Sequence, residues 1–241
     1  MSPESEHRTL GIVKQVLRSK WFWGLGVLSV LILLTVIALP VMNNYRVIQR
    51  IGALGGSFSI KEPDINTVPF YSRFRFNIWG NNTFIKFDSV WVLNLHNTSI
   101  GDSDLIWLSD FKNLESLKLS KTQVSDAGLD HLKCFSKLEF LFLNDTQVGN
   151  PGLIHLKGHK HLERLWLNQT KVTDSGLLHL RDLTSLKRLS LRGTKVTDSG
   201  LINLNDLTDL EYLDLSNTQV TQAGVDQLNA VLPNCVIITA P

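Results

Sequence analysis

Apolar residues recur along the second half of the chain with a constant step of 24 residues. The pattern is clearest at residues 186–201, where Leu189 and Leu191 flank one polar residue. The same pair occurs at Leu93 and Leu95, Leu117 and Leu119, Leu141 and Leu143, Leu165 and Leu167, and Leu213 and Leu215, and in degraded form at Ile237 and Thr239. Threonine and glycine columns keep the step, from Thr98 to Thr218 and from Gly128 to Gly224. Such a period predicts a solenoid in which each repeat contributes one short parallel strand and a helical or 3₁₀ return.

The motifs within the repeat carry a family resemblance. The skeleton L-x-x-L-x-L-x-x-T-x-V is followed by Val-Thr-Asp-Ser-Gly-Leu at residues 172–177 and 196–201. In these motifs the chain resembles leucine-rich repeat proteins, and with its N-terminal apolar segment it is similar to membrane-anchored bacterial members. The resemblance implies an α/β solenoid and a repeat domain at residues 90–241, with six full repeats and a degenerate C-terminal one. It implies no particular ligand, because such folds host many unrelated partners.

The N-terminal part contains one long uncharged apolar run, residues 21–41. At 1.5 Å per residue it would span about 31 Å, the thickness of the hydrocarbon layer. We therefore expect a single transmembrane helix over residues 21–42, used as a signal-anchor after a polar tail of residues 1–20. A cleavable signal peptide is the alternative, which the length of the run and the lack of an A-x-A-like site disfavour. The basic bias of the tail places it in the cytoplasm and the repeats on the outer side of the cell membrane.

Residues 43–89 do not match the repeat and are expected to form a linker and an N-terminal cap. A short helix that stops at Gly55-Gly56 is predicted by Val47, Ile48, Ile51 and Leu54, and residues 57–60 predict a strand. Phe74, Phe76 and Ile78 alternate with polar residues before Ile85 and Phe87, which favours a hairpin, although a helix remains open. The aromatic density indicates a cap that covers the apolar end of the solenoid rather than a flexible spacer.

Two columns predict local chemistry within each repeat. The threonine hydroxyls follow each strand and are expected to bond backbone groups that the turn leaves unpaired. Ser125, Thr173, Thr197 and Thr221 stand where N-caps of the return helices belong. Gly149 replaces the hydroxyl residue in the third repeat and Pro151 follows it, so we expect that return to be less regular.

Several kinds of chemistry have no support in the sequence. The net charge of +2 does not indicate a nucleic-acid partner, and no catalytic, phosphate-binding or cofactor-binding motif is present, which predicts a non-enzyme without cofactors. Cys134 and Cys235 are separated by about four strand spacings, roughly 20 Å, which excludes an intrachain disulfide. His131, His155 and His179 share a repeat position and suggest either solvated surface histidines or, less favourably, a metal site.

Strand alternation predicts a ligand-binding surface on the concave strand face. If the leucines point inward, the residues between them point outward. The candidate ligand-binding residues are Phe140, Phe142, Arg164, Trp166, Arg188, Arg192 and Tyr212. Phe142 should lie beside Trp166, and Arg164 beside Arg188, where the like charges are balanced either by a bound anion or by Glu139, Glu163 and Glu211. This composition favours a ligand with an acidic group and a flat apolar part.

The sequence thus favours a non-catalytic, membrane-anchored recognition protein whose strand face binds a protein or an acidic envelope polymer. The alternative is an architectural envelope protein that acts by self-association through the ends or sides of the solenoid. Recognition requires a distinctive strand face, whereas architecture requires association at micromolar concentration.

Overall fold

The computed structural model of the 241-residue chain describes residues 47, 49–60, 76–77, 82–83 and 90–239. The chain divides into two compact units, residues 1–48 and 49–241. The second unit contains the repeats. The expected transmembrane helix lies outside the described residues, and within the described ranges no helix is long and apolar enough to cross a membrane.

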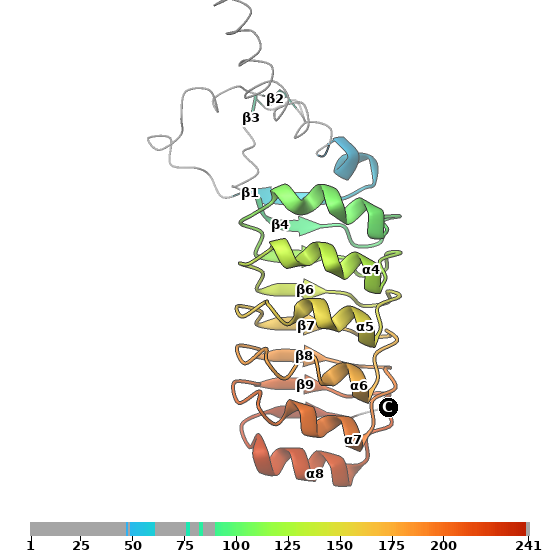
Figure 1. The fold of residues 1–241 in the computed structure, drawn as a ribbon, viewed down its shortest axis with the longest axis vertical. Helices are drawn as coiled ribbons and strands as arrows, with labels where there is room; N and C mark the ends of the chain where they lie inside the picture. Colours follow the sequence, from blue (N-terminus) through green and yellow to red (C-terminus); the bar gives the residue numbers. More distant parts are fainter. Residues whose placement is uncertain (1–46, 48, 61–75, 78–81, 84–89, 240–241) are drawn as a thin grey trace, which may run out of the picture. The chain divides into compact units, whose positions relative to one another are not determined.

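Seven parallel strands, 24 residues apart, form one continuous sheet with an antiparallel strand at its first edge (Figure 1). In sheet order the strands are β1 (Ser57–Ile60), β4 (Val90–Asn94), β5 (Ser116–Lys118), β6 (Phe140–Phe142), β7 (Arg164–Trp166), β8 (Arg188–Ser190), β9 (Tyr212–Asp214) and β10 (Val236–Ile238). Each central leucine pairs with the leucine of the next repeat, and Ile237 pairs with Leu213 at the last strand. The predicted parallel solenoid is confirmed, and the degraded seventh pair also forms a strand.

The return segments run along one side of the strand stack and combine short α-helices with 3₁₀ turns (Figure 1). They are η4 (Asp102–Asp110), α4 (Asp126–Leu129), η5 (Asp130–Cys134), α5 (Asn150–Leu153), η6 (Ile154–Leu156), α6 (Asp174–Leu177), α7 (Asp198–Leu201), η7 (Ile202–Leu204) and α8 (Gln222–Val231). Helices of four residues are far too short to be stable alone. They persist because each one buries its apolar side against the strands and the neighbouring returns.

The core lies between the strands and the returns. Leu117, Leu119, Val124, Leu129 and Leu132 of one repeat are all fully buried, as the inward positions predict. Burying one such side chain contributes about 1.5–3 kcal/mol. Ordering one residue costs about 1–2 kcal/mol, so a single repeat of 24 residues has no net stability and depends on its neighbours.

The N-terminal edge of the stack is covered by residues 49–60. Residues 49–53 are helical and end before Gly55, which has φ +78°, and β1 then pairs antiparallel with β4. The guanidinium of Arg50 lies 3.2 Å above the ring of Trp107 and contacts Asp104 Oδ1 at 3.1 Å. The predicted short helix and strand are both present. Through its contacts with Trp107 and Asp104, Arg50 connects the helix to the first return.

A separate two-stranded ribbon lies in the aromatic-rich segment. Phe76–Asn77 (β2) pairs antiparallel with Asn82–Thr83 (β3), as a hairpin requires. The second strand begins at Asn82, earlier than the position of Ile85 that the alternation suggested. Phe74, Ile78, Ile85 and Phe87 lie outside the described residues.

Each strand is followed by a turn that the threonine column stabilises. In all six turns from Thr98 to Thr218 the hydroxyl donates to the leucine carbonyl three residues earlier, at 2.6–2.7 Å. The predicted role is confirmed, and each bond stays within its own repeat. The residue before each threonine is left-handed, with φ between 54° and 69°, which directs the chain out of the strand.

A second column, which the sequence did not suggest, joins each return to the next. Asp102, Asp126, Asn150, Asp174 and Asp198 each accept the backbone N–H of the N-cap residue in the following repeat, at 2.6–2.8 Å. The hydroxyls of Ser125, Thr197 and Thr221 also donate to this carboxylate. Only Thr197 and Thr221 bond a backbone N–H of their own helix, so the predicted capping positions are right but their hydroxyls mainly link repeats.

The same link explains the glycine column. A methyl group on Gly200 would overlap the carboxylate and Cα of Asp174, and Gly152 stands in the same relation to Asp126. These glycines have ordinary helical backbone, so close approach rather than backbone freedom requires them. The side chain of the linking acid occupies the space that a Cβ would take.

The expectation of an irregular third return is wrong. Helix α5 has four residues, like α4, α6 and α7, and Pro151 lies in its first turn, where a missing N–H is harmless. Gly149 keeps its N-cap place because its backbone N–H still donates to Asp126 Oδ1, at 2.6 Å. The backbone N–H of Gly149 therefore maintains the link between repeats although this position has no hydroxyl.

The chain offers an internal control for the linking carboxylate, because Asn150 performs the role in one repeat. We expect Asp174→Ala to lower the free energy of unfolding by about 1–3 kcal/mol, since the N–H of Thr197 loses its acceptor. Asp174→Asn should stay within about 0.5 kcal/mol of the unmodified protein, because the amide reproduces both bonds that Asn150 makes to Thr173. Urea unfolding measures both values. Equal losses for the two variants would show that charge, not hydrogen bonding, joins the repeats.

One buried polar residue breaks the apolar core. His159 is 3% exposed and occupies the repeat position that holds Phe111, Phe135, Leu183 and Leu207 elsewhere. Neither ring nitrogen has a hydrogen-bond partner among the described residues. Burial lowers the pKa of His159, and the nearby carbonyl of Phe135 offsets this only in part. The folded state therefore favours the neutral imidazole.

Protonation of His159 should couple stability to pH. Because the folded-state pKa is depressed, its contribution is fully present above the unfolded value of about 6.5 and is lost as pH falls below it. We expect His159→Leu to stabilise the protein, and its advantage to grow below pH 6.5 by up to about 1.4 kcal/mol per pH unit. Urea midpoints at pH 7.5 and 5.5 measure this, with the exposed His161→Gln as the control. A pH-independent advantage would contradict the assignment.

Candidate ligand-binding face

The strand face presents the predicted residues on four neighbouring strands. Six of them lie on β6 to β9, and Arg192 follows β8 by two residues. Phe140, Phe142, Trp166 and Tyr212 are partly exposed, and Arg164, Arg188 and Arg192 are exposed. The leucines between them are fully buried, so strand alternation places the six strand residues of the predicted set on the outer side of the sheet, and Arg192 is exposed in the turn after β8.

The aromatic residues form one stack in the middle of this face. Phe142 and Trp166 are paired across β6 and β7, with ring centroids 4.6 Å apart and ring planes at 14°. Their separation matches the spacing between neighbouring strands, so the rings stack along the axis of the repeats. The ammonium of Lys118 lies 5.6 Å from the Phe142 ring, and the guanidinium of Arg164 lies 5.0 Å from the Phe140 ring. The face therefore joins aromatic and cationic groups at short range.

The arginines are placed side by side, as the register predicts. Arg164 pairs with Arg188 across β7 and β8, and Arg188 pairs with Tyr212 on β9. Glu163, one of the acids considered as a neutralising partner, instead accepts a bond from Lys187 Nζ at 2.7 Å, which raises the pKa of Lys187. In the described part of the chain, no carboxylate forms an ion pair with Arg164, Arg188 or Arg192.

A network of amides holds the end of this face in place. Asn144 Oδ1 accepts the backbone N–H of Asn168 at 3.0 Å, and Asn168 Oδ1 accepts the backbone N–H of Arg192 at 3.0 Å. The hydroxyl of Ser190 donates to the same Asn168 oxygen at 2.5 Å and lies 3.3 Å from Asp214 Oδ2. The backbone of Arg192 is thus fixed while its guanidinium has no carboxylate partner among these residues.

A pocket on the same face was not anticipated. It has a volume of about 430 Å³ and lies over β4, β5 and β6. Its lining residues are Asn94, His96, Lys118, Ser120, Lys121, Phe142, Asn144 and Asp145. Phe142 belongs both to this pocket and to the aromatic stack, so the two features are continuous. Strand alternation applied to β4 and β5 was the signal available in the sequence.

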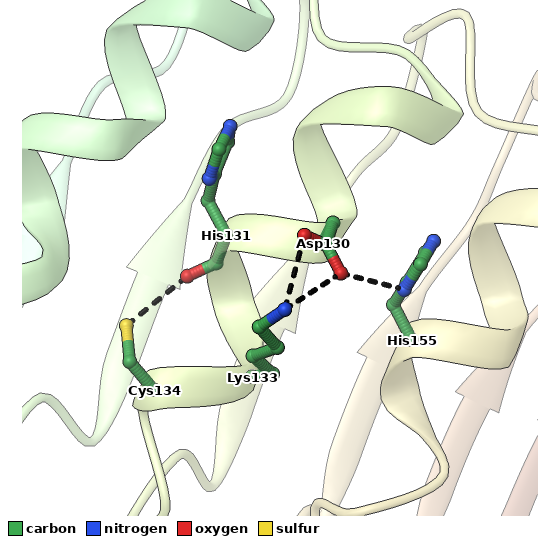
Figure 2. Close-up of polar contacts among 5 residues, drawn as sticks. All are labelled: Asp130, His131, Lys133, Cys134 and His155. Carbon is green, nitrogen blue, oxygen red and sulfur yellow. Dashed lines mark hydrogen bonds and ion pairs between the residues drawn. The ribbon is translucent and has the colours of Figure 1, made fainter.

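In the histidine column on the return side, His155 contacts a carboxylate of the preceding repeat. His155 Nδ1 lies 3.3 Å from Asp130 Oδ1, and Lys133 Nζ donates to both Asp130 oxygens at 3.1 Å (Figure 2). The bond from Lys133 lowers the pKa of Asp130. His131 points away from this carboxylate (Figure 2). Across the described residues, no group of three or more His, Cys, Asp or Glu side chains could hold a metal ion.

The cysteines are free thiols in the structure. Cys134 is partly exposed and donates to the carbonyl of His131 at 3.1 Å, whereas Cys235 is buried. Burial raises the pKa of Cys134 and raises that of Cys235 to about 11. Since the thiolate is the nucleophilic form, neither residue is activated for catalysis at neutral pH.

Comparison with known proteins identifies the repeats. A family model described as "Leucine Rich repeats (2 copies)" matches residues 184–229, and one described as "Leucine Rich repeat" matches residues 112–132. These segments are leucine-rich repeats. No curated protein matches the chain.

Two solved structures similar to this chain are internalins from Listeria monocytogenes. An internalin named inlF has 21% sequence identity and a TM-score of 0.49, over 66% of this chain and 51% of its own. Internalin C2 has 24% identity and a TM-score of 0.45, over 63% of this chain and 71% of its own. The chain thus spans about half the length of the first. These identities are too low to transfer a ligand.

Proposed function

We propose that the chain is a non-catalytic recognition protein whose strand face binds a protein partner or another envelope polymer that carries acidic groups. Leucine-rich repeat folds commonly serve as scaffolds for protein interaction, and their extended strand faces suit this use. The observation that carries the proposal is the stack of Phe142 on Trp166 beside three arginines that lack carboxylate partners in the described part of the chain.

The chemistry of this face matches that of interface centres. Aromatic residues and arginine are enriched where partners bind, because they combine large contact area with specific hydrogen bonding. The pairing of Arg164 with Arg188 brings two positive charges to neighbouring strands. A carboxylate of a ligand would relieve their repulsion, whereas Glu163 is already engaged by Lys187. The proposed contact residues remain the seven that strand alternation selects.

Membrane anchoring forms part of the proposal. The uncharged run of residues 21–41 supports a single transmembrane helix, with the repeats on the outer side of the cell membrane. Anchoring would hold the strand face close to envelope components. It would also raise the local concentration of any partner in the same membrane.

A second candidate function, architectural self-association, is favoured by an aliphatic column on the return side. Ile154, Leu178 and Ile202 occupy one repeat position and are 52%, 47% and 70% exposed. Apolar groups aligned on consecutive repeats form a surface through which copies can associate. Association at micromolar concentration that Ile202→Ser abolishes, measured by sedimentation, would favour this function.

The recognition proposal predicts that Trp166→Ala with Arg188→Ala disrupts partner capture. We expect partners captured from an envelope extract by the full-length protein to fall at least about tenfold, because both changes remove groups typical of binding hot spots. Lys171→Ala with Lys195→Ala, at exposed bridge positions outside the main strands, should leave capture unchanged. Unchanged capture by the first variant, with an unchanged far-ultraviolet circular dichroism spectrum, would exclude the strand face.

The anchoring proposal predicts that the mature protein keeps Met1 and stays with the membrane. After an alkaline wash the protein should remain in the membrane pellet, because a spanning helix is not released by breaking ionic contacts. Peptides from residues 1–20 should be detected by mass spectrometry of that pellet. A soluble product that begins near Val41 or Met42 would show cleavage instead.

A further inference from the structure

The pocket over β4 to β6 adds a second cationic site to the strand face. Lys118 and Lys121 line it, and in the part of the chain that the structure describes neither forms an ion pair with a carboxylate. Lys118 lies 5.6 Å from the ring of Phe142, a contact that leaves its ammonium hydrogens available. Asn94 and Asn144 add side-chain amides to the pocket lining. The pocket therefore offers cations, amides and an aromatic edge together.

The face consequently has cationic side chains on both sides of the aromatic stack, in addition to Arg164 on β7. Lys118 lies on β5, the stack lies on β6 and β7, and Arg188 and Arg192 belong to the β8 repeat. From β5 to β8 there are three strand spacings, or about 14 Å. An extended peptide advances about 3.3 Å per residue, so about four residues cover this distance.

We propose that the strand face binds an extended acidic peptide segment of a partner protein that runs across the strands. Its acidic residues at positions i and i+4 contact the lysine pocket and the arginines of the β8 repeat, and an aromatic or aliphatic residue between them packs on Phe142 and Trp166. This deepens the proposed recognition function and rests on it.

The charge pattern favours a peptide over a uniformly anionic polymer. Asp145 lines the lysine pocket, and Asp214 follows the arginine site on β9. A polymer with a charge on every unit would bring like charges against both carboxylates. A peptide can place acidic residues at only two positions and neutral or basic residues elsewhere. Peptide N–H and C=O groups can also bond the amides of Asn94 and Asn144, which a polymer without such groups cannot do in the same way.

The test is a selection of random linear peptides, displayed on phage, against the purified full-length protein. Peptides enriched on the unmodified protein should carry acidic residues four positions apart, with an aromatic or aliphatic residue between them. Lys118→Ala with Lys121→Ala should abolish enrichment at one acidic position, and Arg188→Ala with Arg192→Ala at the other. Synthetic peptides with both acids should bind at least about tenfold more tightly than those with one glutamine, because a hydrogen bond to a charged group is typically worth this much.

Matched variants separate the inference from the function on which it rests. Lys171→Ala with Lys195→Ala also removes two positive charges, from exposed bridge positions outside the main strands, and should select the same peptides as the unmodified protein. Trp166→Ala should weaken all selected peptides. If Trp166→Ala changes nothing, the strand-face function itself is wrong. Trp166→Ala could instead weaken binding while no spacing of acidic residues is enriched, or while the Lys118 and Lys121 variant selects the same peptides. In either case the proposal of an acidic peptide with two contact sites is wrong, and recognition by the aromatic stack stands.

Discussion

The register of one repeat on the next is the constraint on which the whole structure depends. Each parallel strand pairs with its neighbour without a shift, so Leu117, Leu141, Leu165, Leu189 and Leu213 form one line. A residue type that recurs every 24 positions therefore becomes a column in space. Inward columns bury apolar area that no single repeat can bury alone. Outward columns bring side chains from distant parts of the sequence to the spacing of neighbouring strands.

Two polar columns keep this register at the turns. The threonine hydroxyls bond carbonyls inside each repeat, at 2.6–2.7 Å, and so fix the shape of the turn. The Asp and Asn side chains bond the N-cap residue of the next repeat, and so fix the distance between returns. One column thus acts locally and the other between repeats. The glycines follow from the second column, because the linking side chain fills the space beside them.

Strict periodicity made most of the repeat fold predictable, since it reports the inward residues and the spacing of strands directly. It did not reveal that Asp174 serves the next repeat, because a single sequence shows that the residue recurs but not which donor it accepts from. It also misjudged Gly149, whose backbone N–H replaces the missing hydroxyl. Alternation located the aromatic and arginine residues of the face. The lysine pocket was missed because alternation was followed only along β6 to β9, whereas the outward residues of β4 and β5 also line the pocket.

Two arginines can lie side by side on the strand face because the burial of the leucines beneath them contributes more free energy than the repulsion of their charges costs. Two unit charges about 4 Å apart in water repel by about 1 kcal/mol, and longer side chains can splay to reduce this. Each fully buried leucine beneath them contributes about 1.5–3 kcal/mol. Arg164 and Arg188 therefore stay paired because Leu165 and Leu189 hold their strands in register. The buried leucines outweigh this repulsion, and the contact of the Arg164 guanidinium with the Phe140 ring, at 5.0 Å, offsets part of it. Under the proposed function, a ligand of opposite charge would meet two arginines that the register already holds on neighbouring strands, so that little reorganisation of the face is needed on binding.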